Sequence, residues 1–409
     1  LSHSSAASDV YKRQAMEEEI KGKMLNNAWE VVPKPTDQVV HKSRWVIAIK
    51  LNDDNSIKVV KCRFVGCGYT QVEGRDYDSV FAATLPGVSF RMLLCWITDE
   101  DLDTDHIDAV KAFTQAGIDK KVYVLSPEGF TADQLPPVTS LYCLLLLSAL
   151  EGMKQGANLW FGLNKAAWVK LGFVSWLNET NLYNHPDLKI RVGVFADDTL
   201  CGFPPEHRTE YLAIKKAYSE IIRIGNSDKI EPVLKFTGVQ IERDRNARTI
   251  TIHQTRYIEQ MVDSLKADGI ELKNHDTPHG TSKEQRLAFD RLLEDKDSPP
   301  IDRIRFLKLM GKLVWPSCMS RPDISMEVSS LCSCVSDSRQ SHYDWGLVVA
   351  GYLSAHRSLG ITYGGKLQIP HGLPDMPTGF TESNGLYTAH DSSWGSRPRP
   401  LGGYVIIYM

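Results

Sequence analysis

The chain has 409 residues, of which 42% are hydrophobic and 24% charged, and its formal net charge is −3. This length corresponds to about two or three domains, and the ordinary composition excludes a disordered chain, a collagen and a coiled-coil rod. Because no overall basic excess exists, any nucleic-acid partner has to be inferred from local charge.

The first half of the chain predicts alternating helices and strands. Residues 1–14 lack the apolar core of a signal peptide, and we expect a disordered or non-native extension there. The most apolar run, 141–150, reaches only about half the length of a membrane span and is predicted to be a buried strand or helix. The other predicted elements are a helix from Ala15 to about Asn27, strands over 44–51 and 57–65 joined by a turn at 52–55, a helix over 87–98, a strand over 104–110 and a helix over 153–171.

The second half predicts a hairpin, two further strands and then mainly helices. The hairpin covers 190–203 with Asp197 and Asp198 at its tip, and the acidic, polar segment 269–300 is predicted to be a linker. The remaining predictions are a turn at 243–248 between two strands, helices over 255–268, 285–295, 303–318 and 340–356, and strands within 376–409.

The eight cysteines are too few for a disulfide scaffold. They include no C-x-x-C pair, and no pair of histidines has zinc-finger spacing. We therefore expect reduced, mostly buried thiols and not metal ligands.

Three aspartates form the most informative pattern. Asp197 and Asp198 follow an alternating apolar strand, where two like charges repel unless solvent or a divalent cation compensates them. Asp108 lies among Ile107, Val110 and Phe113 at the end of another predicted strand. The pair alone is also typical of a solvated turn. Together, the three carboxylates could hold two metal ions about 4 Å apart, as in phosphoryl transfer.

Basic residues gather at 42–63. Lys61 and Arg63 alternate along one predicted strand, so their side chains point to the same face. Such a face could bind a triphosphate or a nucleic-acid backbone. The other interpretation is the polar face of a surface hairpin.

Taken in order, these motifs resemble the reverse transcriptase of copia-type LTR retrotransposons, from about Ala15 to the C-terminus. The segments that carry the resemblance are Trp29–Pro33, Trp45-Val46, Lys61–Gln71, Asp76-Tyr77, Phe81-Ala82, Ile107–Phe113, Val122-Tyr123, Pro127–Phe130, Ala149-Leu150, Gly152–Gln155, Trp160, Phe195–Asp198, Phe236, Gly238-Val239, Gln254, Tyr257 and Arg321–Ile324.

The resemblance implies an RNA-directed DNA polymerase with an α+β, right-hand fold. Fingers and palm would cover 15–250, the thumb and linker 251–300, a connection region 301–381 and a truncated RNase H-like start 382–409. The implied partners are an RNA template, a DNA primer, the RNA–DNA hybrid and deoxynucleoside triphosphates. The implied location is the cytoplasm, within a virus-like particle, or the nucleus, with no membrane association.

The resemblance also implies roles for particular residues. Asp108, Asp197 and Asp198 would be the catalytic ligands of two Mg²⁺ ions, which Mn²⁺ can replace. Lys61 and Arg63 would bind the incoming triphosphate. The remaining implied roles are a steric gate against the ribose 2′-hydroxyl for Phe113, which could instead be a core side chain, and a place near the nucleotide or template base for Gln155.

The sequence departs from the family pattern in places, so two other functions stay open. Glu151 replaces an aromatic residue, and Leu144–Leu147 replaces a stretch that normally includes basic residues. Because the sequence stops at Met409, we expect no RNase H cleavage and regard Asp391 as a remnant. The first alternative is a catalytically silent retrotransposon relic that folds and binds nucleic acid. The second is an unrelated magnesium nuclease, against which we count the lack of a water-activating histidine near either acidic motif.

Overall fold

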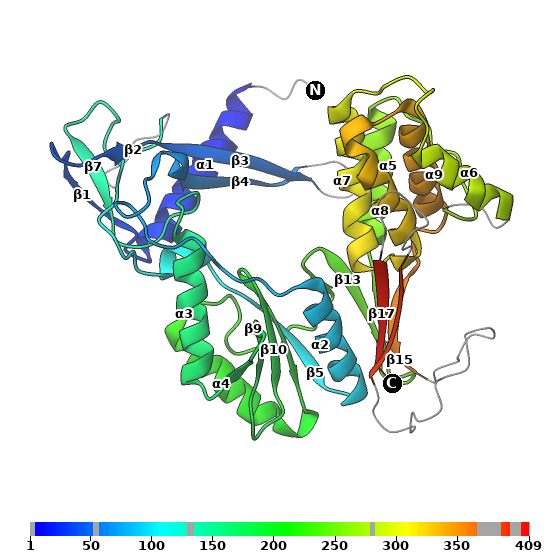
Figure 1. Ribbon diagram of the computed structural model, residues 1–409. Helices are drawn as coiled ribbons and strands as arrows, with labels where there is room; N and C mark the ends of the chain where they lie inside the picture. The colour runs from blue at the N-terminus through cyan, green and yellow to red at the C-terminus, as the bar shows by residue number, and fades with distance from the viewer. Residues whose placement is uncertain are drawn as a thin grey trace.

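The computed structural model describes residues 5–51, 57–128, 135–278, 283–365, 386–392 and 402–408. These residues form the predicted mixture of helices and strands, an α+β fold. Figure 1 shows an N-terminal region around a long hairpin, a central sheet with helices on both faces, and a helical bundle near the C-terminal half of the chain. In the described part of the chain, no helix combines the length and apolar character of a membrane span.

The N-terminal region consists of a long helix, a hairpin and a small sheet. Helix α1 packs against strand β4 of the β3–β4 hairpin, and Cys62 Sγ lies 3.7 Å from the Lys12 carbonyl oxygen. The helix begins at Ser5 and not at the predicted Ala15, and its additional part contacts the hairpin at Lys12. The bounds are α1 Ser5–Met24, β3 Ser43–Leu51 and β4 Ile57–Gly66, with the small sheet β1 Trp29–Pro33, β7 Tyr142–Leu146, β6 Tyr123–Val124 and β2 Val40–His41.

Two details of this region refine the predictions. The apolar run 141–150 contains a strand, β7, which pairs antiparallel with β1 so that Trp29 lies opposite Leu146. The predicted turn at 52–55 lies outside the described residues.

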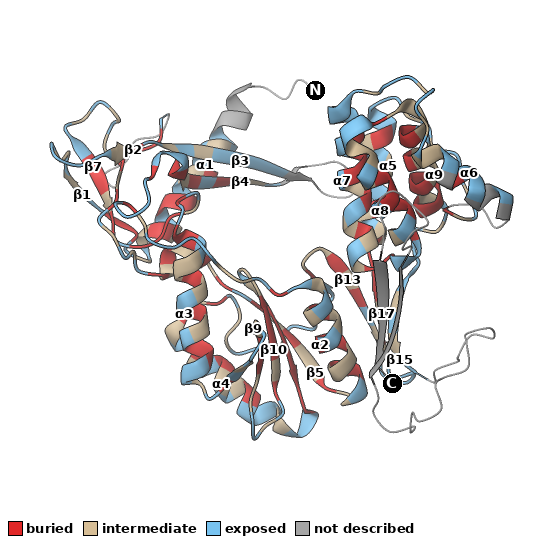
Figure 2. Ribbon diagram, in the orientation of Figure 1, coloured by how far each residue is buried: buried red, intermediate tan, exposed pale blue. Residues whose placement is uncertain are grey.

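The central sheet has the strand order β5-β11-β10-β9-β8, with antiparallel neighbours. Helices α3 and α4 share a buried core with one face, and α2 shares another core with Leu182 and Leu200 of the sheet (Figure 2). Helix α4 was not predicted. The bounds are β5 Asp103–Asp108, α2 Gly87–Asp99, α3 Gly156–Lys170, β8 Val174–Trp176, β9 Glu179–Asn184, β10 Arg191–Phe195, β11 Asp198–Phe203 and α4 Arg208–Ile221.

A buried ion pair joins β5 to α4. Lys215 Nζ lies 2.7 Å from Asp105 Oδ2, and both side chains are at most 1% exposed. Asp105 also accepts hydrogen bonds from the Tyr211 hydroxyl at 2.6 Å and from the Glu231 backbone N–H at 2.7 Å. These contacts satisfy a carboxylate that could not otherwise be buried, and they fix the strand that ends at Asp108.

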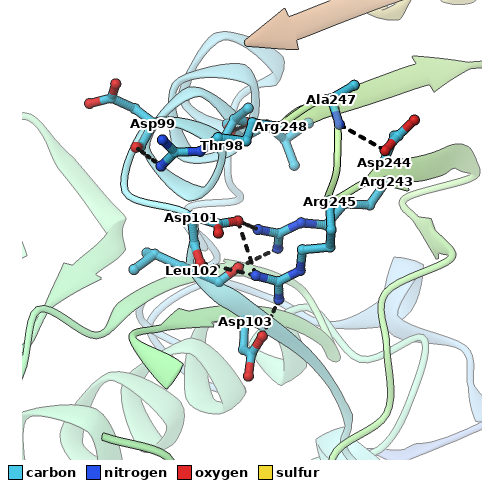
Figure 3. Close-up of polar contacts among 11 residues, drawn as sticks. Thr98, Asp99, Asp101, Leu102, Asp103, Arg243, Asp244, Arg245, Ala247 and Arg248 are labelled. Carbon is cyan, nitrogen blue, oxygen red and sulfur yellow. Dashed lines mark hydrogen bonds and ion pairs between the residues drawn. The ribbon is translucent and has the colours of Figure 1, made fainter. Parts of the chain in front are cut away.

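A second sheet, β12-β13-β14-β15, packs against α2 through a core that includes Phe90 and Phe236. Ion pairs join the β13–β14 turn region to the turn between α2 and β5 (Figure 3). Arg243 Nη2 lies 2.7 Å and Arg245 Nη1 3.0 Å from the same Asp101 oxygen. The bounds are β12 Lys235–Phe236, β13 Val239–Asp244, β14 Thr249–His253 and β15 Gly360–Gly364.

Helices α5 to α9 form one bundle. Phe289, which lies in the predicted linker 269–300, is 1% exposed and belongs to the same core as Phe306 and Leu353. The expected boundary at residue 300, between a thumb and a connection region, therefore does not separate two hydrophobic cores, because residues on both sides share one core. The bounds are α5 Thr255–Ala267, α6 Lys283–Leu293, α7 Arg303–Met319, α8 Ser325–Ser333 and α9 Gln340–Ala355.

A polar cluster joins the α7–α8 turn to α9. Arg321 is 1% exposed and lies 2.7 Å from Asp323, which also accepts a hydrogen bond of 2.7 Å from the Tyr352 hydroxyl. Burial alone would raise the pKa of Asp323, but the hydrogen bonds from Arg321 and Tyr352 outweigh burial and hold this pKa below its usual value.

The remaining described elements are short. Strands β16, Leu386–Ser392, and β17, Gly402–Tyr408, pair antiparallel in the predicted RNase H-like segment, where Asp391 lies opposite Gly403. The side chains of this segment lie outside the described part. Turns of 3₁₀ helix cover Gly68–Thr70, Ala112–Gln115, Pro205–His207, Pro322–Ile324 and Cys334–Asp337.

Candidate active site

The strand pairing brings the three predicted aspartates together. Asp108 at the end of β5 lies directly opposite Asp198, the first residue of β11. Opposite residues in an antiparallel pair have Cβ atoms about 4.5–5.5 Å apart. Asp197 shares the β10–β11 turn with Ala196. The strand register and this turn bring the backbones of the three predicted acids side by side, and their joint role as metal ligands stays a prediction.

Hydrogen bonds hold this turn in place. The Ala109 backbone N–H donates to the Asp197 carbonyl oxygen at 3.2 Å, and Trp160 Nε1 donates to the Ala196 carbonyl oxygen at 2.8 Å. Ala196 has a left-handed φ of 54°, a conformation that an L-residue adopts only when its surroundings enforce it. Strand β5 and helix α3 thus both fix the turn that carries Asp197.

The acids form a negative cluster that His106 and Lys61 compensate in part. Although Asp108 is exposed, partial desolvation by the surrounding protein raises its pKa, and the charges of Asp197 and Asp198 raise this pKa further, whereas His106 and Lys61 lower it. A carboxyl group that is harder to ionise beside two others is the electrostatic situation that a bound cation relieves.

His106 is a component of this cluster that the sequence analysis missed. Its Nε2 lies 3.0 Å from Asp198 Oδ1, and this hydrogen bond raises the pKa of the imidazole. The expectation that no histidine lies near the acids is therefore wrong. The signal was available, because His106 precedes Asp108 by two positions in a strand and so shares its face.

The donors suit a hard cation, but they do not form a closed cage. Carboxylate oxygens are the ligands that Mg²⁺ and Mn²⁺ prefer, and Asp108 and Asp197 are both exposed. Within the described ranges, however, no three or more His, Cys, Asp or Glu side chains converge well enough to hold a metal ion. The site thus offers the right atoms without fixing them around a metal position.

The predicted basic face exists in the hairpin. Lys61 and Arg63 are exposed on β4, while Cys62 and Phe64 between and beyond them are buried, which confirms the predicted alternation. The charge of Lys61 lowers the pKa of Asp108, so this cation acts on the acidic cluster. Triphosphate binding by both residues stays a prediction.

Phe113 fits both interpretations given above. It lies in the 3₁₀ turn Ala112–Gln115, is partly buried and packs against the core under the central sheet. It also lines a solvent-open hollow together with Trp160 and Ala196, next to the turn that carries Asp197. The side chain therefore borders the site and the core at once.

Gln155 lies inside the protein. It is fully buried, its Nε2 donates to the Asp76 carbonyl oxygen at 2.9 Å, and its Oε1 accepts from Gln71 Nε2 at 3.0 Å. Both ends of the amide are therefore occupied in this conformation. Contact with a nucleotide stays a prediction, and the observed role is to join the turn before α3 to the segment after β4.

Gly152 and Gly68 allow two backbones to meet beside this point. The Gly68 N–H donates to the Gly152 carbonyl oxygen at 3.1 Å, and the Gly66 N–H donates to the Glu151 carbonyl oxygen at 2.8 Å. Gly152 has a φ of 85°, and a Cβ atom there would overlap the Gly66 carbonyl oxygen. Glycine is required here both for its conformation and for its lack of a side chain.

Comparison with known proteins identifies the family. Residues 26–278 match the family described as "Reverse transcriptase (RNA-dependent DNA polymerase)". The chain is 26% identical to the Retrovirus-related Pol polyprotein from transposon RE2 of Arabidopsis thaliana, over 87% of this chain and 23% of that protein. It is 23% identical to the corresponding polyprotein from transposon TNT 1-94 of Nicotiana tabacum, over 88% of this chain and 27% of that protein.

A shorter yeast relative and one solved structure are also similar. The putative transposon Ty5-1 protein of Saccharomyces cerevisiae is 26% identical over 74% of this chain and 88% of its own length. A foamy viral protease-reverse transcriptase in complex with double-stranded DNA is 12% identical, with a TM-score of 0.41 over 85% of this chain and 48% of that one. The family assignment depends on the sequence matches alone, and the chain spans about a quarter of the two plant polyproteins. It belongs to the reverse transcriptases of copia-type retrotransposon Pol polyproteins.

Proposed function

We propose that this chain is an RNA-directed DNA polymerase that adds deoxynucleotides to a primer 3′-hydroxyl. The observation that carries the proposal is the pairing of Asp108 with Asp198 beside Asp197, in a chain of this family. In the proposed assignment, the β3–β4 hairpin region is the fingers, the central sheet with its helices is the palm, and the bundle contributes the thumb and connection.

The three carboxylates would hold two divalent cations, Mg²⁺ or Mn²⁺, which when bound activate the attacking hydroxyl and stabilise the leaving pyrophosphate. The chain's own groups supply positioning. Lys61 and Arg63 bind and orient the triphosphate from the exposed face of β4, because ammonium and guanidinium groups pair with phosphate oxygens. Phe113 excludes a ribose 2′-hydroxyl from the hollow that it lines beside Ala196.

His106 has a defined place in this proposal. Its Nε2 contacts one oxygen of Asp198 at 3.0 Å, so it fixes the rotamer of that carboxylate and leaves the other oxygen available to a cation. This is the usual work of a partner outside the ligand set of a metal site. The template and primer are expected to be held by backbone contacts, as is usual for A-like helices.

A second candidate is a chain that folds and binds nucleic acid without catalysis. The lack of a converged three-ligand metal group in the described residues favours it. It predicts salt-sensitive binding to an RNA–DNA hybrid, weakened by the double substitution Lys61→Ala, Arg63→Ala, with no primer extension.

The test is incorporation of dTTP on poly(rA)/oligo(dT) with Mg²⁺ or Mn²⁺. We expect incorporation by the wild type and a loss of about 10²-fold or more in the double variant Asp197→Asn, Asp198→Asn. Asp187→Asn is the matched control, since Asp187 is an exposed acid at the opposite end of β10. Incorporation that survives in the double variant contradicts the assignment, absence of extension with intact hybrid binding favours the silent chain, and cleaved strands indicate a nuclease.

A further inference from the structure

Helix α1 carries charged side chains that are buried, although the whole helix lies before the segment that matches the family. Glu19 and Lys23 are 2% and 0% exposed, and they form an ion pair of 3.3 Å one helical turn apart. Lys23 also pairs with Glu151, and Glu19 also pairs with Lys111. Two acidic and two basic side chains thus alternate in an ion-pair network without net charge, in the order Glu151, Lys23, Glu19 and Lys111.

This ion-pair network differs from surface ion pairs because the side chains of Glu19 and Lys23 at its centre are buried. Charges removed from water are tolerated only when they are paired and hydrogen-bonded. Burial lowers the pKa of Lys23 and of Lys111, and the negative charge of Glu151 opposes this effect at both lysines. Loss of one member would leave its partner uncompensated, so each contact constrains the geometry of the next.

The contacts reach three elements of the proposed site. Glu19 Oε1 accepts a hydrogen bond of 3.1 Å from the Phe64 backbone N–H, next to Arg63 on β4. Glu151 belongs to the turn whose carbonyl oxygen accepts from Gly66 at the end of the same strand. Lys111 lies between Asp108 and Phe113, and it has a left-handed φ of 53°. One helix therefore contacts the hairpin, the turn before α3 and the turn that presents Phe113.

The turn around Phe113 has further support from the same side. Asn26 Nδ2, just after α1, donates to Thr114 Oγ1 at 2.8 Å, and Thr114 in turn donates from its hydroxyl to the Lys111 carbonyl oxygen at 2.9 Å. A left-handed, non-glycine residue persists only when surrounding contacts determine its conformation. For Lys111, the ion pair with Glu19 and this pair of hydrogen bonds are such contacts.

We infer that Glu19 and Lys111 are positioning residues that set the place of Phe113, so that α1 controls how strictly the enzyme selects deoxyribose over ribose. The inference rests on the proposed function, because it acts through the proposed steric gate. A side chain that excludes one hydroxyl group has to be placed within a fraction of an ångström, whereas general folding tolerates larger shifts.

Gly22 supplies an independent way to disturb this contact. A Cβ atom at Gly22 would lie 2.9 Å from Lys111 Cε, so alanine there has to displace the end of the lysine side chain. Alanine also favours the helix by about 1 kcal/mol relative to glycine. Gly22→Ala should therefore stabilise α1 and at the same time displace the Lys111 side chain. An effect of this variant on selectivity cannot be attributed to loss of helix stability.

The experiment measures kcat/KM for dTTP and for UTP on poly(rA)/oligo(dT) with the full chain. In Lys111→Met and in Glu19→Gln, we expect the preference for dTTP over UTP to fall about tenfold, and in Gly22→Ala to fall about twofold. The double variant Glu19→Gln, Lys111→Met is expected to lose less than the sum of the two single variants, because both remove the contact between Glu19 and Lys111. Glu17→Gln is the matched control, since Glu17 lies on the same helix with its side chain 56% exposed.

A preference that is unchanged in Lys111→Met and Gly22→Ala, with the variants folded, overturns the inference. Wild-type chain that incorporates no dTTP refutes the proposed function instead. In that case, amide hydrogen exchange of a peptide covering 109–118 tests the inference alone. Faster exchange in Glu19→Gln than in Glu17→Gln supports the positioning role, and equal exchange in both contradicts it.

Discussion

Removal of the buried cation that faces Asp105 should destabilise the chain strongly. In Lys215→Met, the carboxylate of Asp105 stays buried and loses its ion pair of 2.7 Å, while it keeps the hydrogen bonds from Tyr211 and Glu231. Breaking a buried pair in this way costs about 3–5 kcal/mol. Since two hydrogen bonds remain, we expect about 3 kcal/mol, the lower end of that range.

The assay is urea unfolding followed by tryptophan fluorescence and circular dichroism. The matched control is Lys216→Met, because Lys216 is the exposed neighbour on the same helix, and it should change the free energy of unfolding by less than about 0.5 kcal/mol. The double variant Asp105→Asn, Lys215→Met should lose less than Lys215→Met alone, because no unpaired charge stays buried. A loss below about 1 kcal/mol in Lys215→Met would refute the reasoning that this pair fixes β5 to α4.

Three further predictions concern other parts of the fold. Gly152→Ala should cost about 2 kcal/mol or more in chemical denaturation, because its φ is positive and its Cβ has no room, whereas Gly162→Ala, at an open position within α3, should stabilise by about 0.5–1 kcal/mol. The lowered pKa of Asp323 means that its contribution is present above the usual carboxyl pKa and is lost as pH falls; unfolding of Asp323→Asn followed from about pH 6 to pH 3 should therefore show a weaker acid dependence than the wild type. Arg243→Met should lower the melting temperature more than Arg245→Met, because the Arg243 side chain is 17% exposed and that of Arg245 is 43% exposed; equal effects would contradict this.

Local patterns predicted many elements correctly. The helices near 87–98 and 303–318 and the hairpin tip at Asp197-Asp198 follow from apolar spacing and turn chemistry, which depend on neighbours in the sequence. Helix α4 was missed because its buried stripe includes Tyr211, Lys215 and Tyr218. The polar atoms of these side chains form hydrogen bonds in the folded protein, but the sequence alone shows polar residues where a buried helix face would be expected to be apolar.

The sequence predicted the residues of the candidate site better than their positions, because local patterns do not specify long-range contacts. The cross-strand register of Asp108 and Asp198 depends on long-range pairing, so the sequence suggested three acids but could not place them. Glu19 and Lys23 look like a surface pair one helical turn apart, and only the packing of α1 on the hairpin buries them. Gln155 is the opposite case. The family resemblance predicts it near the substrate, but both ends of its amide form hydrogen bonds inside the protein.

In the proposed function, Asp108, Asp197 and Asp198 together hold a pair of divalent cations. It is tested most directly by counting bound Mn²⁺ with electron paramagnetic resonance, in the presence of an RNA–DNA primer–template and a non-hydrolysable dTTP analogue. We expect about two bound ions in the wild type, fewer in Asp108→Asn, and an unchanged number in Asp187→Asn. Equal binding of Mn²⁺ by the wild type and Asp108→Asn would contradict it.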